Sequence, residues 1–388
     1  MPAPRTRRIG FDAIRALRNG TGLGNYSRGV LRALRQHDGR MAMHLYSPSP
    51  PLPEFRNFPR EIDAELHLPD DRASGVGRRA LGSGYWRTFR LGHAAAKAGV
   101  ELYHGLTHEI PRDLPRTGVR SVVTFHDLIY QRHPDLFPVF DRWSYRWRYE
   151  WSARHADAIV AVSTRTRDDL LECYRLDPAR ITVIAPPRDP AFAAATTPAE
   201  REAARSKYGL PREFVLSVGT LEPRKNHAML LAAISQFGRA DQLPLVLIGR
   251  DGGSAAALRA TVHSGGLRDQ VHMLRDVPPA DLPALVQSAT LFLYPSAVEG
   301  FGMPIVEALS AGVPVIAASG GHLNEAGGPD TRYVPAGEPA AWAAAISELL
   351  ADGTLRARMR ERGAEYARQF DSEKIAAQLT SVYDAVTR

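Results

Sequence analysis

Two glutamates eight residues apart, Glu299 and Glu307, lie on either side of a short run of glycine and proline, Gly-Phe-Gly-Met-Pro. Proline suits the first turn of a helix because its missing N–H would have no partner there, so we expect a loop over 295–302 and a helix over 304–310. The start of that helix offers unpaired N–H groups and a positive dipole end, which attract a phosphate or a developing oxyanion. An ordinary helix start with acidic dipole partners explains this stretch equally well when it is taken alone.

A second candidate anion site is the pair Arg224 and Lys225, in the turn between a predicted strand ending at Gly219 and a helix expected from about Asn226. Arginine offers a two-pronged hydrogen-bond fork and lysine a compact charge, so the pair could neutralise a diphosphate. A solvated basic turn is the plainer alternative.

A histidine, His126, stands near the carboxyl end of the predicted strand Ser121–Asp127. Ligands of open parallel sheets bind outside these strand ends. His126 could donate a hydrogen bond to a substrate there or transfer a proton, although a single histidine is more often structural.

Three glycines near the amino terminus, at 20, 22 and 24, fall between the first predicted strand and the first predicted helix. The dinucleotide fingerprint G-x-G-x-x-G fails at Asn25, so a nicotinamide site is weakly supported. We expect a flexible loop that faces a phosphate, with Gly22 and Gly24 closest to it.

Metal and disulfide chemistry have no support in the sequence motifs. The chain contains no Asp-x-Asp, H-E-x-x-H or C-x-x-C, so no metal site is expected. Its single cysteine, Cys173, cannot form an intramolecular disulfide and is expected to be a small core residue.

The elements that must position these residues alternate between short apolar runs and amphipathic stretches, which is typical of parallel sheets with crossover helices. The predicted strands are Arg8–Ala13, Met41–Ser47, Leu102–His104, Ser121–Asp127, Ala158–Ser163, Ile181–Ala185, Phe214–Gly219, Leu245–Gly249, Val271–Leu274, Leu291–Tyr294 and Val313–Ala317. The helices expected in the first half are Asn25–Arg35, Tyr85–Ala98, Arg142–Arg154 and Thr164–Arg175. The proline-rich segment 47–60 is expected to be an exposed loop.

The length of 388 residues exceeds the size at which one core usually divides, so two domains are expected. A stretch rich in proline and alanine places the linker at about 186–200. We therefore predict an α/β protein with two Rossmann-like, doubly wound domains facing a cleft, over 1–190 and 200–370. Residues 371–388 should form an amphipathic helix that needs a surface to cover.

Composition and charge limit the partners. With 44% apolar and 23% charged residues and no run of ~18 apolar residues, the chain is expected to be a globular cytoplasmic protein. Residues 1–190 carry 30 Lys and Arg against 21 Asp and Glu, whereas 191–388 carry 19 against 21. This positive first half favours a phosphorylated ligand or an anionic membrane surface; nucleic acid is the least favoured partner because no motif for it is present.

Glu299 to Glu307 form an E-x7-E motif, followed by ALSAGVPVIAAS. In their double-Rossmann setting these residues resemble the GT-B glycosyltransferases of family 4, retaining enzymes that transfer a sugar from a nucleoside diphosphate. The resemblance spans nearly the whole chain. It implies that Glu299 faces the donor sugar, that Glu307 binds the ribose hydroxyls, and that backbone amides of Phe301, Gly302 and Met303 hold sugar and phosphate.

The same resemblance assigns Gly22 and Gly24 to a loop near the donor phosphates and His126 to the histidine beside the transferred sugar. Lys225 matches the family's basic motif, but Thr220 stands where an arginine is expected, so Arg224 is the candidate replacement. The helix after Phe370 would return to cover the first domain.

The function implied is that of a mannosyltransferase-like hexosyltransferase of bacterial surface polysaccharide synthesis, with His126, Glu299 and Lys225 at the reaction centre. GDP-mannose is the first candidate donor and UDP-sugars are next, with no metal or cofactor. The acceptor would be a glycan or a lipid-linked oligosaccharide at the inner face of a membrane. A GT-B epimerase, a phosphorylase and a non-catalytic nucleotide-sugar-binding protein are the alternatives.

Overall fold

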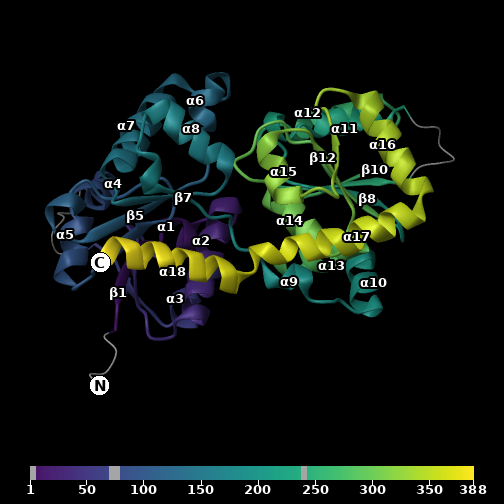
Figure 1. Cartoon of the computed structure of the whole chain (residues 1–388). Coiled ribbons are helices and arrows are strands. Elements are labelled where there is room, and N and C mark those ends of the chain that lie inside the picture. The colour runs from purple at the N-terminus through teal and green to yellow at the C-terminus, as the bar shows by residue number, and fades with distance from the viewer. Residues whose placement is uncertain (1–5, 70–78, 237–242) are drawn as a thin grey trace. The chain divides into compact units, whose positions relative to one another are not determined.

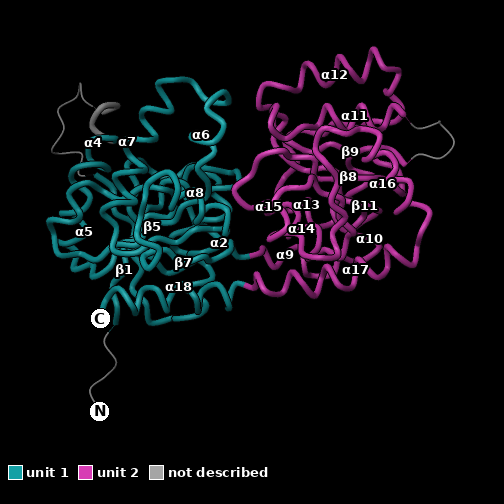
Figure 2. The backbone as a smooth tube through the Cα atoms, turned by 45° about the horizontal axis from the view of Figure 1, so that its top comes forward, with its two compact units in different colours: residues 1–187, 372–388 teal, residues 188–371 magenta. Residues whose placement is uncertain are grey.

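The computed structural model describes residues 6–69, 79–236 and 243–388 (Figure 1). The chain divides into two compact units, one made of Met1–Pro187 with Ser372–Arg388 and the other of Arg188–Asp371 (Figure 2). The second unit is therefore a continuous stretch inserted between two pieces of the first. Most of the stretch expected as a linker belongs to the second unit, where it forms helix α9 (Pro190–Ala193) and the capping residue of α10 (Pro198–Lys207).

The first unit contains a seven-stranded sheet in the order β3-β2-β1-β4-β5-β6-β7, and every pair of neighbours is parallel. Its strands are β1 (Arg8–Asp12), β2 (Ala42–Tyr46), β3 (Ala64–His67), β4 (Leu102–Gly105), β5 (Arg120–Phe125), β6 (Ala158–Ala161) and β7 (Ile181–Val183). The chain moves outward from β1 to β3 and then returns to β4. Loops leave β1 and β4 in opposite directions, which makes the carboxyl ends of these two strands the place where a ligand is expected.

Crossover helices join the strands of the first unit. They are α1 (Ile14–Arg18), α2 (Gly22–His37), α3 (Phe58–Glu61), α4 (Arg79–Phe89), α5 (Leu91–Lys97), α6 (Ile129–Arg132), α7 (Val139–His155) and α8 (Thr164–Tyr174). The last helix, α18 (Ser372–Thr387), packs on α2 and β5. Its residue Tyr383 is fully buried and its hydroxyl lies 2.6 Å from Nδ1 of His104, so α18 is part of this unit's core.

The second unit contains a six-stranded parallel sheet in the order β10-β9-β8-β11-β12-β13. Its strands are β8 (Val215–Val218), β9 (Leu245–Ile248), β10 (Val271–Leu274), β11 (Leu291–Tyr294), β12 (Val315–Ala318) and β13 (Arg332–Val334). Its other helices are α11 (His227–Ile234), α12 (Ala255–Ser264), α13 (Leu282–Ser288), α14 (Met303–Ser310), α15 (Gly321–Gly327), α16 (Pro339–Ala351) and α17 (Gly353–Ala367). Here the strand order reverses between β8 and β11.

The prediction of two Rossmann-like parallel sheets is confirmed, with corrections in detail. Strands β3 and β13 were not predicted, since β3 is a half-buried edge strand and β13 has only three residues. The segment 47–60 is not all loop, because it holds a short 3₁₀ turn (Pro53–Phe55) and most of α3. The helix expected over 85–98 is two helices, α4 and α5, that meet at Arg90.

The glycine-rich segment also differs from the prediction of a flexible loop. Helix α1 follows β1 at once, and Gly22 and Gly24 lie in the first turn of α2. A Cβ atom on Gly24 would come within 1.7 Å of the carbonyl oxygen of Asn19, whereas one on Gly22 would meet nothing. Gly24 is therefore required for the close passage of the chain between α1 and α2.

Within the described part of the chain, no helix combines the length and apolarity needed to cross a lipid bilayer.

Candidate functional site

The loops that follow β8 and β11 come together where the strand order of the second sheet reverses. A 3₁₀ turn (Pro223–Lys225) follows β8, and the loop 295–302 follows β11. The backbone N–H of Ala297 donates to the carbonyl of Arg224 over 3.1 Å, which ties the two loops together. Five side chains from these segments meet here and are called the switch-point cluster: Arg224, Lys225, Tyr294, Ser296 and Glu299.

Glu299 is the centre of the switch-point cluster. Its Oε1 accepts from the Nζ of Lys225, from the hydroxyl of Tyr294 at 2.9 Å and from the hydroxyl of Ser296 at 2.5 Å. Lys225 Nζ also lies 3.0 Å from the Tyr294 oxygen. The predicted donor-sugar residue and the predicted phosphate-binding lysine therefore form a direct ion pair in this structure.

Arg224 joins the same carboxylate from the other side. Its Nη1 lies 3.1 Å from Oε2 of Glu299 and donates to the carbonyl of Val298 over 3.1 Å, while Nη2 lies 2.8 Å from Glu222. Thr220, where an arginine was expected, contributes no contact of this kind among the described residues. The structure thus brings Arg224 and Lys225 onto one carboxylate.

Burial and charge act in opposite directions on Glu299, whose side chain is only 11% exposed. Burial alone would raise the pKa of Glu299, but the positive charges of Lys225 and Arg224 outweigh it and lower that pKa to about 2. The carboxylate is therefore charged at every physiological pH, and it holds two cations in fixed positions.

Helix α14 begins directly after the loop that carries Glu299. Gly302 precedes its first residue, Met303, with a φ of 110°, and no side chain caps this end. A Cβ on Gly302 would also come within 2.9 Å of Leu323. The Phe301 ring is buried and packs edge-to-face on Phe370, with ring centroids 5.5 Å apart. The side chain of Phe301 thus points into the protein core, which leaves only its backbone available for a ligand.

Glu307 lies one turn inside α14 and differs sharply from Glu299. It is half-buried, and its carboxylate has no hydrogen-bond or ion-pair partner among the residues that the structure describes. Burial, together with the negative charge of Asp189, raises the pKa of Glu307 to about 7. Within the described part of the chain, the carboxylate of Glu299 is therefore fully paired and that of Glu307 has no partner.

The candidate histidine belongs to the first unit. His126 directly follows β5, is 9% exposed, and donates from Nε2 to the carbonyl of Leu106 over 2.9 Å. Burial lowers the pKa of His126 to about 3, and nearby His108 adds to this effect, so the ring is neutral. Because Nε2 carries the donated proton, Nδ1 is the acceptor nitrogen, and His126 is suited to accept a hydrogen bond rather than to donate one.

A pocket in the first unit was not predicted. It lies where β1 and β4 end, and its empty volume is about 320 Å³, part of it open to solvent. Arg87 on α4 lies 2.5 Å from Asp12 and 3.0 Å from Glu109, and Arg148 on α7 lies 2.9 Å from Glu109. The sequence did not reveal this site, because Arg87 comes 75 residues after its partner Asp12, the last residue of β1.

Two Rossmann-like parallel sheets in one chain, with a charged cluster at the strand-order reversal of the second sheet, define a GT-B fold. A glycosyltransferase from Rickettsia africae ESF-5 is similar over 99% of this chain and 100% of that chain, with a TM-score of 0.78 and 17% identity. Anabaena Alr3699/HepE, solved in complex with UDP, is similar over 98% and 100% of the two chains, with a TM-score of 0.74 and 18% identity.

The sequence comparisons give the family. Residues 200–366 match the family model of glycosyl transferases group 1, and residues 20–192 match that of glycosyltransferase family 4. The O-antigen chain mannosyltransferase B of Escherichia coli is 32% identical over 292 residues, which are 73% of this chain and 74% of that protein. A D-inositol 3-phosphate glycosyltransferase of Corynebacterium glutamicum (strain R) is 32% identical over 240 residues, 59% and 57% of the two chains. The chain belongs to the group 1 glycosyltransferases of family 4.

Proposed function

We propose that this protein is a retaining, metal-independent hexosyltransferase that moves a sugar from a nucleoside diphosphate to a glycan or lipid-linked oligosaccharide of a bacterial surface polysaccharide. The observation that carries the proposal is the switch-point cluster, in which Arg224 and Lys225 are held by Glu299 beside the start of α14. Two fixed cations and a helix start together suit a diphosphate leaving group.

In this proposal the donor takes its place along the loop after β11. Lys225 and Arg224 stabilise the diphosphate, and the amides of Phe301, Gly302 and Met303 donate to phosphate and sugar oxygens. The carboxylate of Glu307, which has no partner among the described residues, accepts hydrogen bonds from the ribose hydroxyls. GDP-mannose is the first candidate donor because the relative from Escherichia coli is called a mannosyltransferase, and a UDP-sugar is the second because HepE binds UDP.

The proposed reaction needs no nucleophile from the enzyme. The bond between the anomeric carbon and the diphosphate oxygen breaks, and the acceptor oxygen bonds to that carbon on the same face of the sugar. The acceptor proton moves to the departing diphosphate. The protein then acts by positioning and by charge: Lys225 and Arg224 stabilise the charge that grows on the diphosphate, while Glu299 and neutral His126 orient the sugar hydroxyls.

The proposed acceptor site is the pocket of the first unit. Two of its three arginines pair with carboxylates, Arg87 with Asp12 and Glu109 and Arg148 with Glu109, while Arg112 lies on the ring of Trp147. The pocket therefore offers hydrogen-bond donors and acceptors with only a small excess of positive charge. Such a lining suits the hydroxyl groups of a glycan. Gly22 and Gly24, in the first turn of α2, stay candidates for the donor-phosphate contact of this unit.

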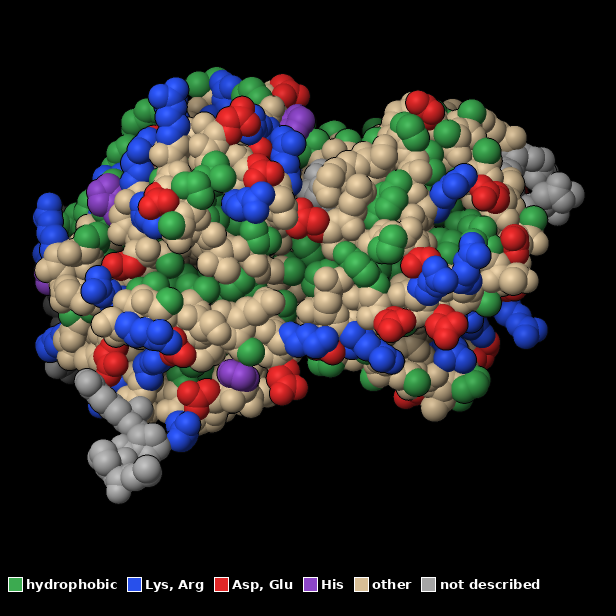
Figure 3. Space-filling model, viewed as in Figure 1, with side chains coloured by type: hydrophobic (Ala, Val, Ile, Leu, Met, Phe, Trp, Pro, Cys, Tyr) green, Lys and Arg blue, Asp and Glu red, His purple; other side chains and the backbone are tan. Residues whose placement is uncertain are grey.

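An anionic membrane is the proposed location of a lipid-linked acceptor. Helix α7 and the turn before it expose large apolar side chains, among them Phe140 at 75%, Trp143 at 65% and Trp147 at 43%. Basic residues lie on the same helix, including Arg142 and Arg146. Hydrophobic and basic side chains are adjacent over the α6 and α7 region (Figure 3). Aromatic and basic groups on one helix are typical of a surface that binds at the headgroup layer of an anionic membrane.

The proposal is tested by sugar transfer and nucleotide release with a panel of GDP- and UDP-sugars. Lys225→Ala should lower kcat/KM by about 10²–10³-fold because a charge that stabilises the leaving group is lost. Glu299→Gln should lower kcat/KM by about 10–100-fold, because the two cations lose their shared counter-charge. Lys207→Ala is the matched control, since this exposed lysine on α10 pairs with Asp281 and is not part of the cluster.

Full activity in both Lys225→Ala and Glu299→Gln would show that the switch-point cluster is not the donor site. Isomerised donor without an acceptor, or a strict need for free phosphate, would instead identify an epimerase or a phosphorylase. Tight donor binding with no turnover for any acceptor would indicate a non-catalytic nucleotide-sugar-binding protein.

A further inference from the structure

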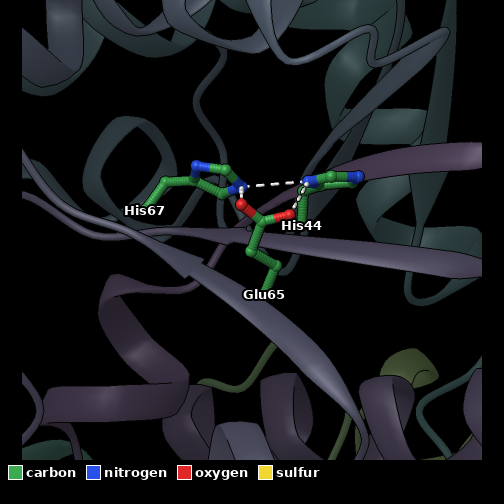
Figure 4. Close-up of side chains that lie close together, drawn as sticks. All are labelled: His44, Glu65 and His67. Carbon is green, nitrogen blue, oxygen red and sulfur yellow. Dashed lines mark hydrogen bonds and ion pairs between the residues drawn. The ribbon is translucent and has the colours of Figure 1, made fainter.

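Two imidazole rings and a carboxylate converge at one edge of the first unit's sheet, on the edge strand β3 and its neighbour β2 (Figure 4). His44 on β2 and Glu65 and His67 on β3 supply them. Nδ1 of His44 lies 2.9 Å from Nε2 of His67 and 3.3 Å from Oε2 of Glu65. Nε2 of His67 lies 3.5 Å from Oε1 of Glu65. The convergence involves two imidazole nitrogens and a carboxylate, which is a common set of metal ligands.

The register of the two strands explains why these side chains meet. His44 lies directly opposite Glu65, and His67 follows two residues later on β3, so all three share one face of the sheet. The ring of Tyr46 stacks on His67, with centroids 4.7 Å apart and an interplanar angle of 15°. His44 is buried and His67 is half-buried, so both rings have restricted orientations.

The spacing of the ligand atoms fits a tetrahedral ion. Metal–ligand bonds of about 2.0–2.1 Å at tetrahedral angles separate the ligand atoms by about 3.3–3.4 Å. The two ring nitrogens lie 2.9 Å apart, and each lies 3.3–3.5 Å from a different oxygen of Glu65. One ligand atom from each of the three residues lies within 4.8 Å of the other two, so small side-chain shifts would bring all three onto one ion. The Glu65 side chain is 64% exposed, and solvent can therefore supply a fourth ligand.

We propose that His44, Glu65 and His67 bind one divalent ion of the zinc class and so fasten the edge strand β3 to β2. Two imidazoles with one carboxylate favour Zn²⁺, Co²⁺ or Ni²⁺ over Mg²⁺ and Ca²⁺, which prefer oxygen ligands in larger number. The site uses none of the residues assigned to sugar transfer.

The test is equilibrium dialysis of the untagged full-length protein against Zn²⁺ after chelator treatment. The unchanged protein should bind one more Zn²⁺ per chain than Glu65→Gln or His67→Asn, or bind that ion at least about tenfold more tightly. Zn²⁺ should raise its melting temperature while Mg²⁺ does not. Co²⁺ should give the intense visible absorption of a tetrahedral complex.

His272→Asn is the matched control, since this residue lies on β10, the edge strand of the other sheet, outside any trio of ligands found in the described residues. This variant should bind Zn²⁺ as the unchanged protein does. Glu65 is exposed, so Glu65→Gln is expected to fold, which circular dichroism and the melting temperature without metal verify. Equal Zn²⁺ binding in the unchanged protein and in both ligand variants overturns the proposal, as does a Zn²⁺ effect that all four proteins share.

Discussion

Lys225 and Glu299 form an ion pair at the strand-order reversal of the second sheet, and the hydroxyl of Tyr294 bonds to both. This contact joins two segments that are 74 residues apart in sequence. Because the lysine is already fixed by a buried carboxylate, little side-chain freedom remains to be lost when a phosphate arrives. The motif glutamate thus has a use before any sugar is bound, which is to hold the cations in place.

The first prediction concerns the arginine that stands at 224 instead of 220. Arg224→Ala should lower kcat/KM by about 10–100-fold, because one of the two cations on Glu299 is lost. Adding Thr220→Arg to that variant should restore part of the activity if the charge is what matters. Initial rates with a saturating acceptor measure both effects.

Arg205→Ala supplies the comparison for this series, since Arg205 pairs with Glu202 on α10 outside the cluster. Arg224→Ala with unchanged kcat/KM would show that Lys225 alone serves the diphosphate. A double variant no better than Arg224→Ala would show that position 220 cannot reach the same place.

The second prediction concerns the helix start at Gly302. Alanine there would have to adopt a φ near 110° and would press on Leu323, so Gly302→Ala should lose roughly 2–4 kcal/mol of folding free energy and most of the transfer activity. Urea denaturation and donor KM are the measurements. Gly253→Ala is matched for backbone strain, with a φ of 100° and no close neighbour, and should lose only about 1–2 kcal/mol. Equal losses in the two variants would contradict the packing argument.

The third prediction follows from the raised pKa of Glu307. Between its ordinary pKa of 4.5 and about 7, folded Glu307 keeps a proton that the unfolded chain releases, so stability should fall as pH rises through this window and level off above it. In Glu307→Gln, the decrease in folding free energy across this pH window should be smaller by roughly 1–3 kcal/mol. If the ionised form accepts the ribose hydroxyls, donor KM should decrease as pH rises through 7 in the unchanged protein only.

Glu361→Gln is the control for pH, because this glutamate is exposed on α17. Its stability and KM profiles should follow those of the unchanged protein. Identical pH profiles for Glu307→Gln and Glu361→Gln would mean that Glu307 does not titrate in this range.

The fourth prediction tests the apolar side of α7. Replacing Phe140 and Trp143 by serine should weaken co-sedimentation with anionic vesicles by at least about tenfold, because each ring contributes about 1–2 kcal/mol of burial in lipid. Binding of the unchanged protein should also weaken in high salt. Leu68→Ser, which removes an exposed apolar side chain after β3, should bind as before. Vesicle binding that is equal for anionic and neutral lipid would refute the membrane proposal.

The fold could be predicted where apolar runs are long. Strand β11 begins and ends as predicted, because Leu291–Tyr294 is a compact and fully buried apolar run next to turn residues. Strand β3 was missed because Ala-Glu-Leu-His carries only two apolar residues and pairs with a neighbour on one side. Local pattern identifies buried strands better than edge strands, since only buried strands need apolar residues on both faces.

The sequence predicted which residues form the candidate site, but not which of them contact one another. Glu299, Glu307 and Lys225 were recognisable from motif and position, but the pairing of Lys225 with Glu299 depends on β8 and β11 being neighbours, which no local pattern reveals. The trio His44, Glu65 and His67 was missed for the same reason: its members are adjacent only because β2 pairs with β3.

Helix α18 completes the first unit, although 184 residues of the second unit separate it from Pro187. During synthesis at about 5–20 residues per second, those residues take roughly ten to forty seconds to make. For that time the nascent first unit lacks the helix that covers α2, and His104 lacks the hydroxyl of Tyr383. The second unit can fold as soon as its own residues have left the ribosome. The first unit, although its synthesis begins first, is therefore the last to complete its fold.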